Sequence, residues 1–180
     1  MRHQSEVLER QKPLITTYLM EPEKAWVTDV AIVKGQNLND PFHTEVIAND
    51  ELETPIQIGV HRAVGGLHDA PNPGDMLCTA LAACFESTLR LVANRLGITL
   101  VETEVKATAE VDVRGTLMVD KSVPVAFQKM TLTVNVSCEQ TAEQLLHTML
   151  AATEKSCIVL QTLKMALPVR VKTNFAVLAA

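Results

Sequence analysis

Two stretches in the middle of the chain alternate strictly between apolar and polar residues, and this alternation constrains the fold more than any other feature. They are EVKATAEVDVRG, residues 104–115, and KMTLTVNVSC, residues 129–138. A period of two is typical of a β-strand with one buried and one solvated face. Because the two stretches follow each other and each keeps a polar face, they indicate an antiparallel pair. The apolar faces hold Val105, Ala107, Ala109, Val111 and Val113 in the first stretch and Met130, Leu132, Val134, Val136 and Cys138 in the second.

A long helix is predicted before these strands, over residues 75–96. Asp75 favours the helix N-terminus by capping or through the helix dipole, and Gly97 ends the helix. The first half of the helix is apolar on all sides, which indicates burial inside something larger. The preceding residues 61–74, HRAVGGLHDAPNPG, are typical of a loop because glycine and proline recur in them.

A second helical pattern begins after the strand pair. Thr141 and Gln144 fit a capping box at its start, and Pro168 ends it. A break is expected near residues 155–156. The following VRVKTNF, residues 169–175, is predicted to be a last strand.

The N-terminal part of the chain predicts a helix and several short strands. Residues 1–24 form a helical extension, and the expected strands lie at 25–33, 43–50 and 55–60. Residues 25–180 are then one domain. The order of elements predicts an α+β fold, with antiparallel sheets packed around two long buried helices.

Charge and composition exclude several classes of function. The 180 residues carry a net charge of −5 and only 3% aromatic residues, which argues against a nucleic-acid-binding protein. The N-terminus is charged and interrupted by Pro13, unlike a signal peptide. No run approaches the ~20 apolar residues of a membrane span. We therefore expect a soluble, cytoplasmic protein without a membrane partner, whose four cysteines are reduced.

The cysteines separate into two kinds. Cys138 lies on the apolar face of a predicted strand and is interpreted as packing. Cys78 precedes Cys84 by six residues, which turns it about 240° away on a helix, so it is also interpreted as core. Cys84 and Cys157 lie on the two different long helices, 73 positions apart. If those helices pack together, the two sulfurs could meet.

A close pair of thiols suggests redox chemistry, in which one thiolate attacks a substrate and the other thiol resolves the product as a disulfide. Burial as inert packing is the commoner fate of such cysteines, so the spacing alone leaves both interpretations open. No metal or cofactor is expected, because the chain has no C-x-x-C and its histidines lack the spacing of zinc ligands.

Two segments resemble the OsmC/Ohr family, the osmotically inducible protein C-like and organic hydroperoxide resistance proteins. PNPGDMLCTALAACFESTLRLVANRLGI, residues 71–98, resembles the family's central helix, which reads roughly P-x-[DE]-L-L-x-A-A-L-A-A-C. AATEKSCIVLQTL, residues 151–163, is similar to the second cysteine segment, A-x-x-x-C-P-V. The resemblance extends over residues 25–176, so residues 25–180 are expected to be an OsmC-like domain.

The resemblance implies an intertwined homodimer with two active sites at the subunit interface. It implies a stress-response antioxidant enzyme, a thiol peroxidase that reduces organic hydroperoxides and uses a dithiol or a lipoylated protein as reductant. On the matched motifs, Cys84 is the peroxidatic thiol and Cys157 the resolving thiol. The family pairs an arginine with a glutamate beside the peroxidatic thiol.

At the expected position of that glutamate this chain has Gly74, followed by Asp75. Lys34 and Arg62 are the nearest replacements for the arginine. Asp75 and Arg62 are therefore the supporting candidates, against the simpler roles of a helix cap and a solvated loop residue. Two alternatives to the enzyme remain: a non-catalytic OsmC-like dimer that binds a small apolar ligand in an interface pocket, and a purely structural dimer.

Overall fold

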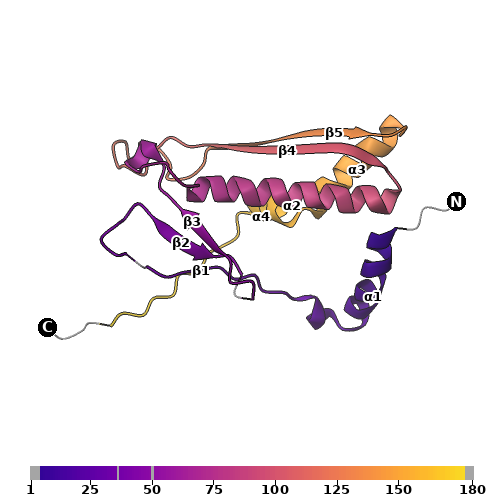
Figure 1. Cartoon of the computed structure of the whole chain (residues 1–180), viewed down its shortest axis with the longest axis horizontal. Coiled ribbons are helices and arrows are strands. Elements are labelled where there is room, and N and C mark those ends of the chain that lie inside the picture. The colour runs from indigo at the N-terminus through magenta and orange to yellow at the C-terminus, as the bar shows by residue number, and fades with distance from the viewer. Residues whose placement is uncertain (1–4, 36, 50, 177–180) are drawn as a thin grey trace.

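The computed structural model describes residues 5–35, 37–49 and 51–176 and has mixed α+β architecture. Its elements are α1 (Glu6–Met20), η1 (Pro22–Ala25), β1 (Ile32–Val33), β2 (Thr44–Ile47), β3 (Pro55–Ile58), η2 (Arg62–Val64), α2 (Pro73–Leu96), β4 (Leu100–Glu110), β5 (Lys129–Cys138), α3 (Glu143–Ser156) and α4 (Ile158–Met165). The long helix α2 runs along the β4–β5 ribbon, and the small β1–β3 sheet lies on the other side of it (Figure 1). The α+β prediction is confirmed.

The β4–β5 ribbon forms from the two alternating stretches. The strands pair antiparallel, with Val105 opposite Val134 and Ala107 opposite Leu132. Along both strands half-buried residues alternate with exposed ones, as the sequence predicts. The first strand ends at Glu110, earlier than the alternation suggests, so the connection spans residues 111–128.

A capping box fixes the start of α2. Asn72 is the N-cap, and its Oδ1 accepts hydrogen bonds from the backbone N–H of Gly74 and Asp75 at 2.8 and 3.3 Å. In return the Oδ2 of Asp75 accepts from the backbone N–H of Asn72 at 2.9 Å. The cap interpretation of Asp75 is thus confirmed. Gly97, at φ 71°, ends the helix in the left-handed conformation that glycine adopts without strain.

Only one face of α2 is buried within this chain. That face packs on β4, α3 and α4 and is made by Leu81, Phe85, Leu89, Val92 and Ala93. Thr79, Ala80 and Ala83 are exposed, so the prediction of a helix buried on all sides is wrong for the single chain. By length and composition, α2 is the one helix among the described residues that could span a membrane, contrary to the expectation that no segment would. The core helix of a soluble protein can have the same length and apolar composition.

The second helical region differs from its prediction at both ends. Ala142 is the N-cap of α3, and the Thr141 hydroxyl instead donates to the carbonyl of Glu139 at 2.8 Å. The predicted capping box of Thr141 and Gln144 is therefore wrong, because a local turn engages the hydroxyl. The break falls at Cys157, one residue beyond the predicted position, and separates α3 from α4.

Of the four predicted strands outside the β4–β5 ribbon, three form only in part and one does not form. Of residues 25–33 only Ile32 and Val33 pair, with Val46 and Ile47 of β2. Residues 169–175 form no strand and are exposed. An extended segment becomes a strand only where a neighbour takes its hydrogen bonds. Within the described chain, residues 26–31 and 169–175 meet no such neighbour.

The N-terminal helix is attached to the far end of α2. Ser5 caps α1 by accepting from the backbone N–H of Leu8, and its hydroxyl donates to Oδ1 of Asn94 at 2.6 Å. The helix has no buried residue. The predicted boundary between residues 24 and 25 stays a prediction, and it falls inside η1.

A cluster around His43 joins the start of β2 to the loop before α2. The imidazole of His43 contacts Asp40 Oδ2 through Nδ1 at 2.7 Å and the Asp69 carboxylate through Nε2 at 3.1 Å. The hydrogen bond with Asp40, followed by that with Asp69, raises the pKa of His43. This His43 cluster thus holds two loops together most firmly when the imidazole is protonated.

Candidate active site

Two cysteines far apart in the sequence meet where α2 packs against α3 and α4. The Sγ atoms of Cys84 and Cys157 lie 3.4 Å apart, although 73 positions separate the residues. Cys84 lies in the middle of α2, and Cys157 occupies the junction of α3 and α4. The sulfurs meet because α2 packs against both of these helices. The structure therefore brings together the two residues that the sequence singled out.

The helix break positions Cys157. Its backbone N–H donates to the carbonyl of Thr153 in the last turn of α3 at 2.9 Å. Its carbonyl accepts from the N–H of Gln161 in the first turn of α4 at 3.0 Å. Cys157 thus belongs to the hydrogen bonding of both helices, and its backbone is extended, at φ −74° and ψ 108°. The extended backbone at Cys157 ends α3 and begins α4 without a glycine or proline, and it fixes the residue against the core.

The two sulfurs differ in access to solvent. Cys157 is 0% exposed and belongs to the buried cluster with Phe85, Leu89 and Met149. Cys84 packs against that cluster but is only partly buried. A small molecule arriving from solvent therefore meets Cys84 first.

Burial also sets the protonation state of the inner thiol. It raises the pKa of Cys157, which the nearby backbone amides of Leu160 and Val159 offset only in part. The hydrogen bond with Cys84 raises this pKa further. The usual pKa of cysteine is already about 8.5, so Cys157 is a protonated thiol at neutral pH.

The two supporting candidates do not reach the thiol pair. Asp75 is held in the capping box at the start of α2, nine residues and thus about 14 Å along the axis from Cys84. Arg62 is exposed in η2. Among the described residues, Cys157 is the one side chain at hydrogen-bond distance from the Cys84 sulfur. Neither Asp75 nor Arg62 contacts the Cys84 sulfur in this structure. Their supporting roles stay predictions.

A carboxylate two residues after Cys84 is engaged elsewhere. Glu86 accepts from the hydroxyl of Thr103 on β4 at 2.8 Å and pairs with Arg90 at 2.8 Å. A free carboxylate beside a thiol would disfavour the thiolate. The two bonds hold the charge of Glu86 toward the ribbon, where it also ties α2 to β4.

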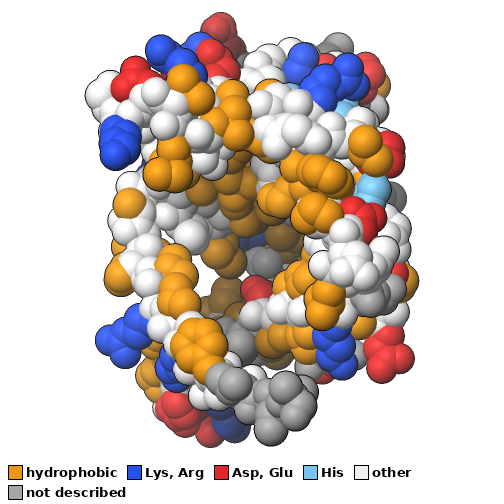
Figure 2. Space-filling model, turned by 90° about the vertical axis from the view of Figure 1, so that its left-hand side faces the viewer, with side chains coloured by type: hydrophobic (Ala, Val, Ile, Leu, Met, Phe, Trp, Pro, Cys, Tyr) orange, Lys and Arg blue, Asp and Glu red, His pale blue; other side chains and the backbone are white. Residues whose placement is uncertain are grey.

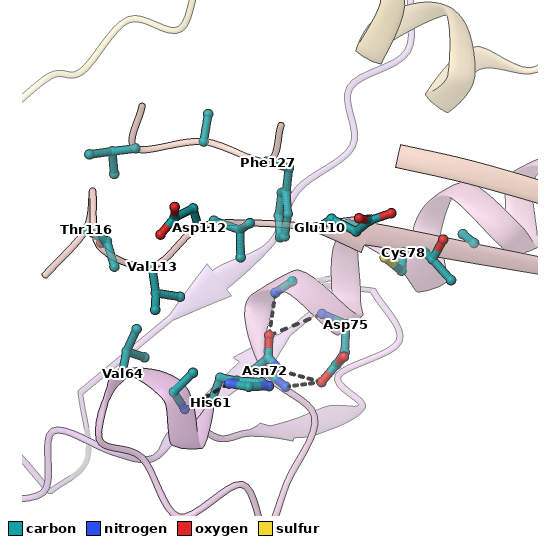
Figure 3. Close-up of a pocket in the computed structure, with 18 residues that line it drawn as sticks. His61, Val64, Asn72, Asp75, Cys78, Glu110, Asp112, Val113, Thr116 and Phe127 are labelled. Carbon is teal, nitrogen blue, oxygen red and sulfur yellow. Dashed lines mark hydrogen bonds between the residues drawn. The ribbon is translucent and has the colours of Figure 1, made fainter. Parts of the chain in front are cut away.

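A separate cavity of about 930 Å³ lies at the N-terminal end of α2, between η2, the end of β4 and the β4–β5 connection (Figure 3). Its walls are mostly apolar and include Ala107, Ala109, Val111, Val113, Val125 and Phe127. Figure 2 views this end of the molecule and shows hydrophobic side chains around a hollow. Neither Cys84 nor Cys157 lines the cavity.

Cys78 lines this cavity, so its assignment to the core is corrected. The turn of about 240° that separates it from Cys84 directs it away from the thiol pair and toward the β4–β5 connection. Burial, and then the nearby charge of Asp75, raises the pKa of the Cys78 thiol. The structure thus has a partly buried third thiol in a different environment from that of the pair.

Phe127 is a cavity residue that sequence reasoning missed. Its ring stands over the first turn of α2 (Figure 3), and a Cβ added to Gly74 would lie 2.9 Å from Cζ of the ring. The absence of a side chain at Gly74 therefore lets the ring pack there. This is the position at which the resemblance places a glutamate. The one signal for this contact in the sequence is a glycine near the start of a helix, because the contact joins residues 53 positions apart.

The comparisons with known proteins agree with this architecture. The family model described as OsmC-like protein matches residues 66–172, more than half of the chain. The chain belongs to the OsmC-like family. The matched region contains both Cys84 and Cys157. No functionally curated protein matches the chain.

Solved structures of other OsmC-like proteins share the fold at low sequence identity. An OsmC-like protein of unknown function from Vibrio cholerae is 13% identical, with a TM-score of 0.62, over 76% of this chain and 94% of that one. An OsmC-like protein from Mycoplasma pneumoniae is 15% identical, with a TM-score of 0.58, over 77% and 87%. A structure from Legionella pneumophila named as an organic hydroperoxide resistance protein is 21% identical, with a TM-score of 0.57, over 78% and 91%. Identities this low establish the fold alone.

Proposed function

We propose that this OsmC-like protein is a thiol peroxidase that reduces organic hydroperoxides with Cys84 and Cys157. The observation that carries the proposal is the 3.4 Å separation of their sulfurs. The difference in burial supports a division of labour, in which the partly accessible Cys84 reacts with the peroxide and the buried Cys157 resolves the product. The name of the Legionella pneumophila structure supports the same substrate class.

The reaction uses the two thiols in sequence. The Cys84 thiolate attacks the terminal peroxide oxygen, the O–O bond breaks, and the alkoxide takes a proton from water and leaves as an alcohol. Cys84 is then a sulfenic acid. The Cys157 sulfur attacks the Cys84 sulfur, the S–O bond breaks, and the hydroxyl leaves with the Cys157 proton as water. A disulfide needs a separation of about 2.05 Å, so the sulfurs have little distance to close.

The disulfide must be reduced for another turnover. We infer that a dithiol or a lipoylated protein does this by thiol–disulfide exchange in a reducing cytoplasm. The apolar surroundings of Cys84, which packs against the buried core cluster, favour alkyl or lipid hydroperoxides over hydrogen peroxide.

A homodimer is part of the proposal. The exposed face of α2 around Ala80 and Ala83, and the alternating residues 169–175, leave apolar surface that a second copy could cover. Sedimentation velocity at micromolar concentration tests this. A single monomeric species would contradict the dimer without touching the thiol chemistry.

One experiment decides the peroxidase proposal. Reduced protein is treated with one equivalent of an alkyl hydroperoxide, quenched by alkylation and mapped by peptide mass spectrometry. We expect a rapid Cys84–Cys157 disulfide, and the same disulfide in the Cys78→Ser control. If both thiols remain free after minutes, the peroxidase proposal is abandoned.

The cavity of about 930 Å³ favours a second candidate function, a non-catalytic dimer that binds a small apolar ligand. Under this alternative a medium-chain alcohol raises the melting temperature of the protein, while peroxide leaves the thiols free. A Phe127→Ala variant should then lose the thermal shift, because the ring forms part of the cavity wall. A purely structural module responds to neither compound.

A further inference from the structure

We propose that Cys157 acts before any disulfide forms, as a hydrogen-bond donor that stabilises the Cys84 thiolate. The inference rests on the proposed peroxidase function and adds a step to it. A resolving thiol is needed only after the sulfenic acid has formed. Here the buried thiol already contacts the reactive sulfur in the reduced protein, at 3.4 Å.

The surroundings of Cys84 leave this role open. A thiolate needs a positive charge, a helix N-terminus or a hydrogen-bond donor to form readily at neutral pH. Cys84 lies in the middle of α2, far from its N-terminus. Among the described residues no cationic group lies at hydrogen-bond distance from its sulfur, whereas Cys157 does.

Cys157 is suited to donate because it keeps its proton. It is 0% exposed, and burial disfavours its charged form. A hydrogen bond to the charged form of an acid favours that form. The contact therefore has a fixed polarity, with the buried Cys157 as the donor and Cys84 as the acceptor.

The same proton then completes the resolving step. When Cys84 has become a sulfenic acid, the Cys157 sulfur forms the S–S bond and its proton leaves with the hydroxyl as water. No further oxidant or reductant is required, because the peroxide has already removed two electrons from Cys84. One proton thus serves first as a hydrogen-bond donor and then as part of the leaving water.

The test compares Cys157→Ser, which keeps a donor, with Cys157→Ala, which removes it. The rate of Cys84 alkylation by iodoacetamide is followed against pH by peptide mapping, with no peroxide present. We expect the midpoint of the alanine profile to lie about one pH unit above that of the serine variant. At neutral pH, Cys84 alkylation should be about threefold slower in the alanine variant, because lost thiolate is partly offset by greater nucleophilicity.

Cys78 provides an internal control in the same digests. It lines the separate cavity, so its alkylation profile should be the same in all proteins. If alanine disturbs the fold and changes the Cys78 rate, Cys157→Thr and Cys157→Val give a second donor and non-donor pair of matched volume.

Coinciding Cys84 profiles for the donor and non-donor variants would overturn the inference, wherever the shared midpoint lies. This result is separable from failure of the peroxidase proposal. Alkylation reports on the Cys84 thiolate even if the protein reduces no peroxide. Conversely, peroxide turnover with coinciding profiles would leave Cys157 with the resolving role only.

Discussion

Oxidation of the thiol pair should stabilise the fold by an amount that follows from its position in the chain. A Cys84–Cys157 disulfide closes a loop between residues 73 positions apart. The loss of chain entropy in the unfolded state for such a loop corresponds to about 4 kcal/mol of added stability. The sulfurs start 3.4 Å apart, so only a small movement is needed to form the bond. Strain from that movement would lower the gain, which makes about 4 kcal/mol an upper value.

Urea unfolding of the oxidised and the reduced protein measures this difference. With a slope of about 2 kcal/mol per molar urea, the midpoint should rise by up to about 2 M on oxidation. Both forms must be compared at one protein concentration, because association also changes the apparent stability. The change should be fully reversed by a dithiol.

Matched variants separate the disulfide from general effects of oxidation. Cys78→Ser should keep the redox-dependent shift, since Cys78 lines the separate cavity. Cys84→Ser should lose it. Coincident midpoints for oxidised and reduced protein, with the disulfide confirmed by mass, would refute the reasoning. That result would mean that bond formation strains the α2 packing as much as it restricts the unfolded chain.

Three further predictions address turnover, core packing and pH. Cys84→Ser should abolish peroxide reduction, while Cys157→Ser should accumulate an over-oxidisable sulfenate detectable by mass; equal residual turnover in both would contradict the division of labour. Leu89 is 0% exposed in the core, so Leu89→Ala should lower the free energy of unfolding by about 2–5 kcal/mol in urea titrations. The raised pKa of His43 means that its cluster stabilises the fold fully below the unfolded value, about 6.5, and that this contribution is lost as pH rises through the folded value. His43→Gln should therefore lower the urea midpoint more at about pH 6 than at about pH 9, and a loss independent of pH would disprove this.

The sequence by itself determined the elements whose causes are local. The alternation of residues 104–110 and 129–138 specified β4 and β5 and the faces they bury. Gly97 specified the end of α2, and Asp75 its capped start. These features depend on side chains a few positions apart, so a linear pattern contains the physical information needed to predict them.

Contacts across the chain decided the rest. The sequence predicts strands over residues 25–33 and 169–175, yet only Ile32 and Val33 find a partner in the described chain, because a strand requires hydrogen bonds from a neighbour. The packing of Phe127 on Gly74 likewise depends on how the β4–β5 connection folds back. No local pattern specifies such contacts.

The thiol pair depends both on local sequence patterns and on contacts across the chain. Sequence patterns placed Cys84 and Cys157 on the two long helical segments and suggested that they could meet. Only the packing of α2 on the α3–α4 junction decided that the sulfurs lie 3.4 Å apart, and that one is buried while the other is partly accessible. Distance and burial arise from the relative placement of helices, which depends on the whole core and not on the residues beside each cysteine.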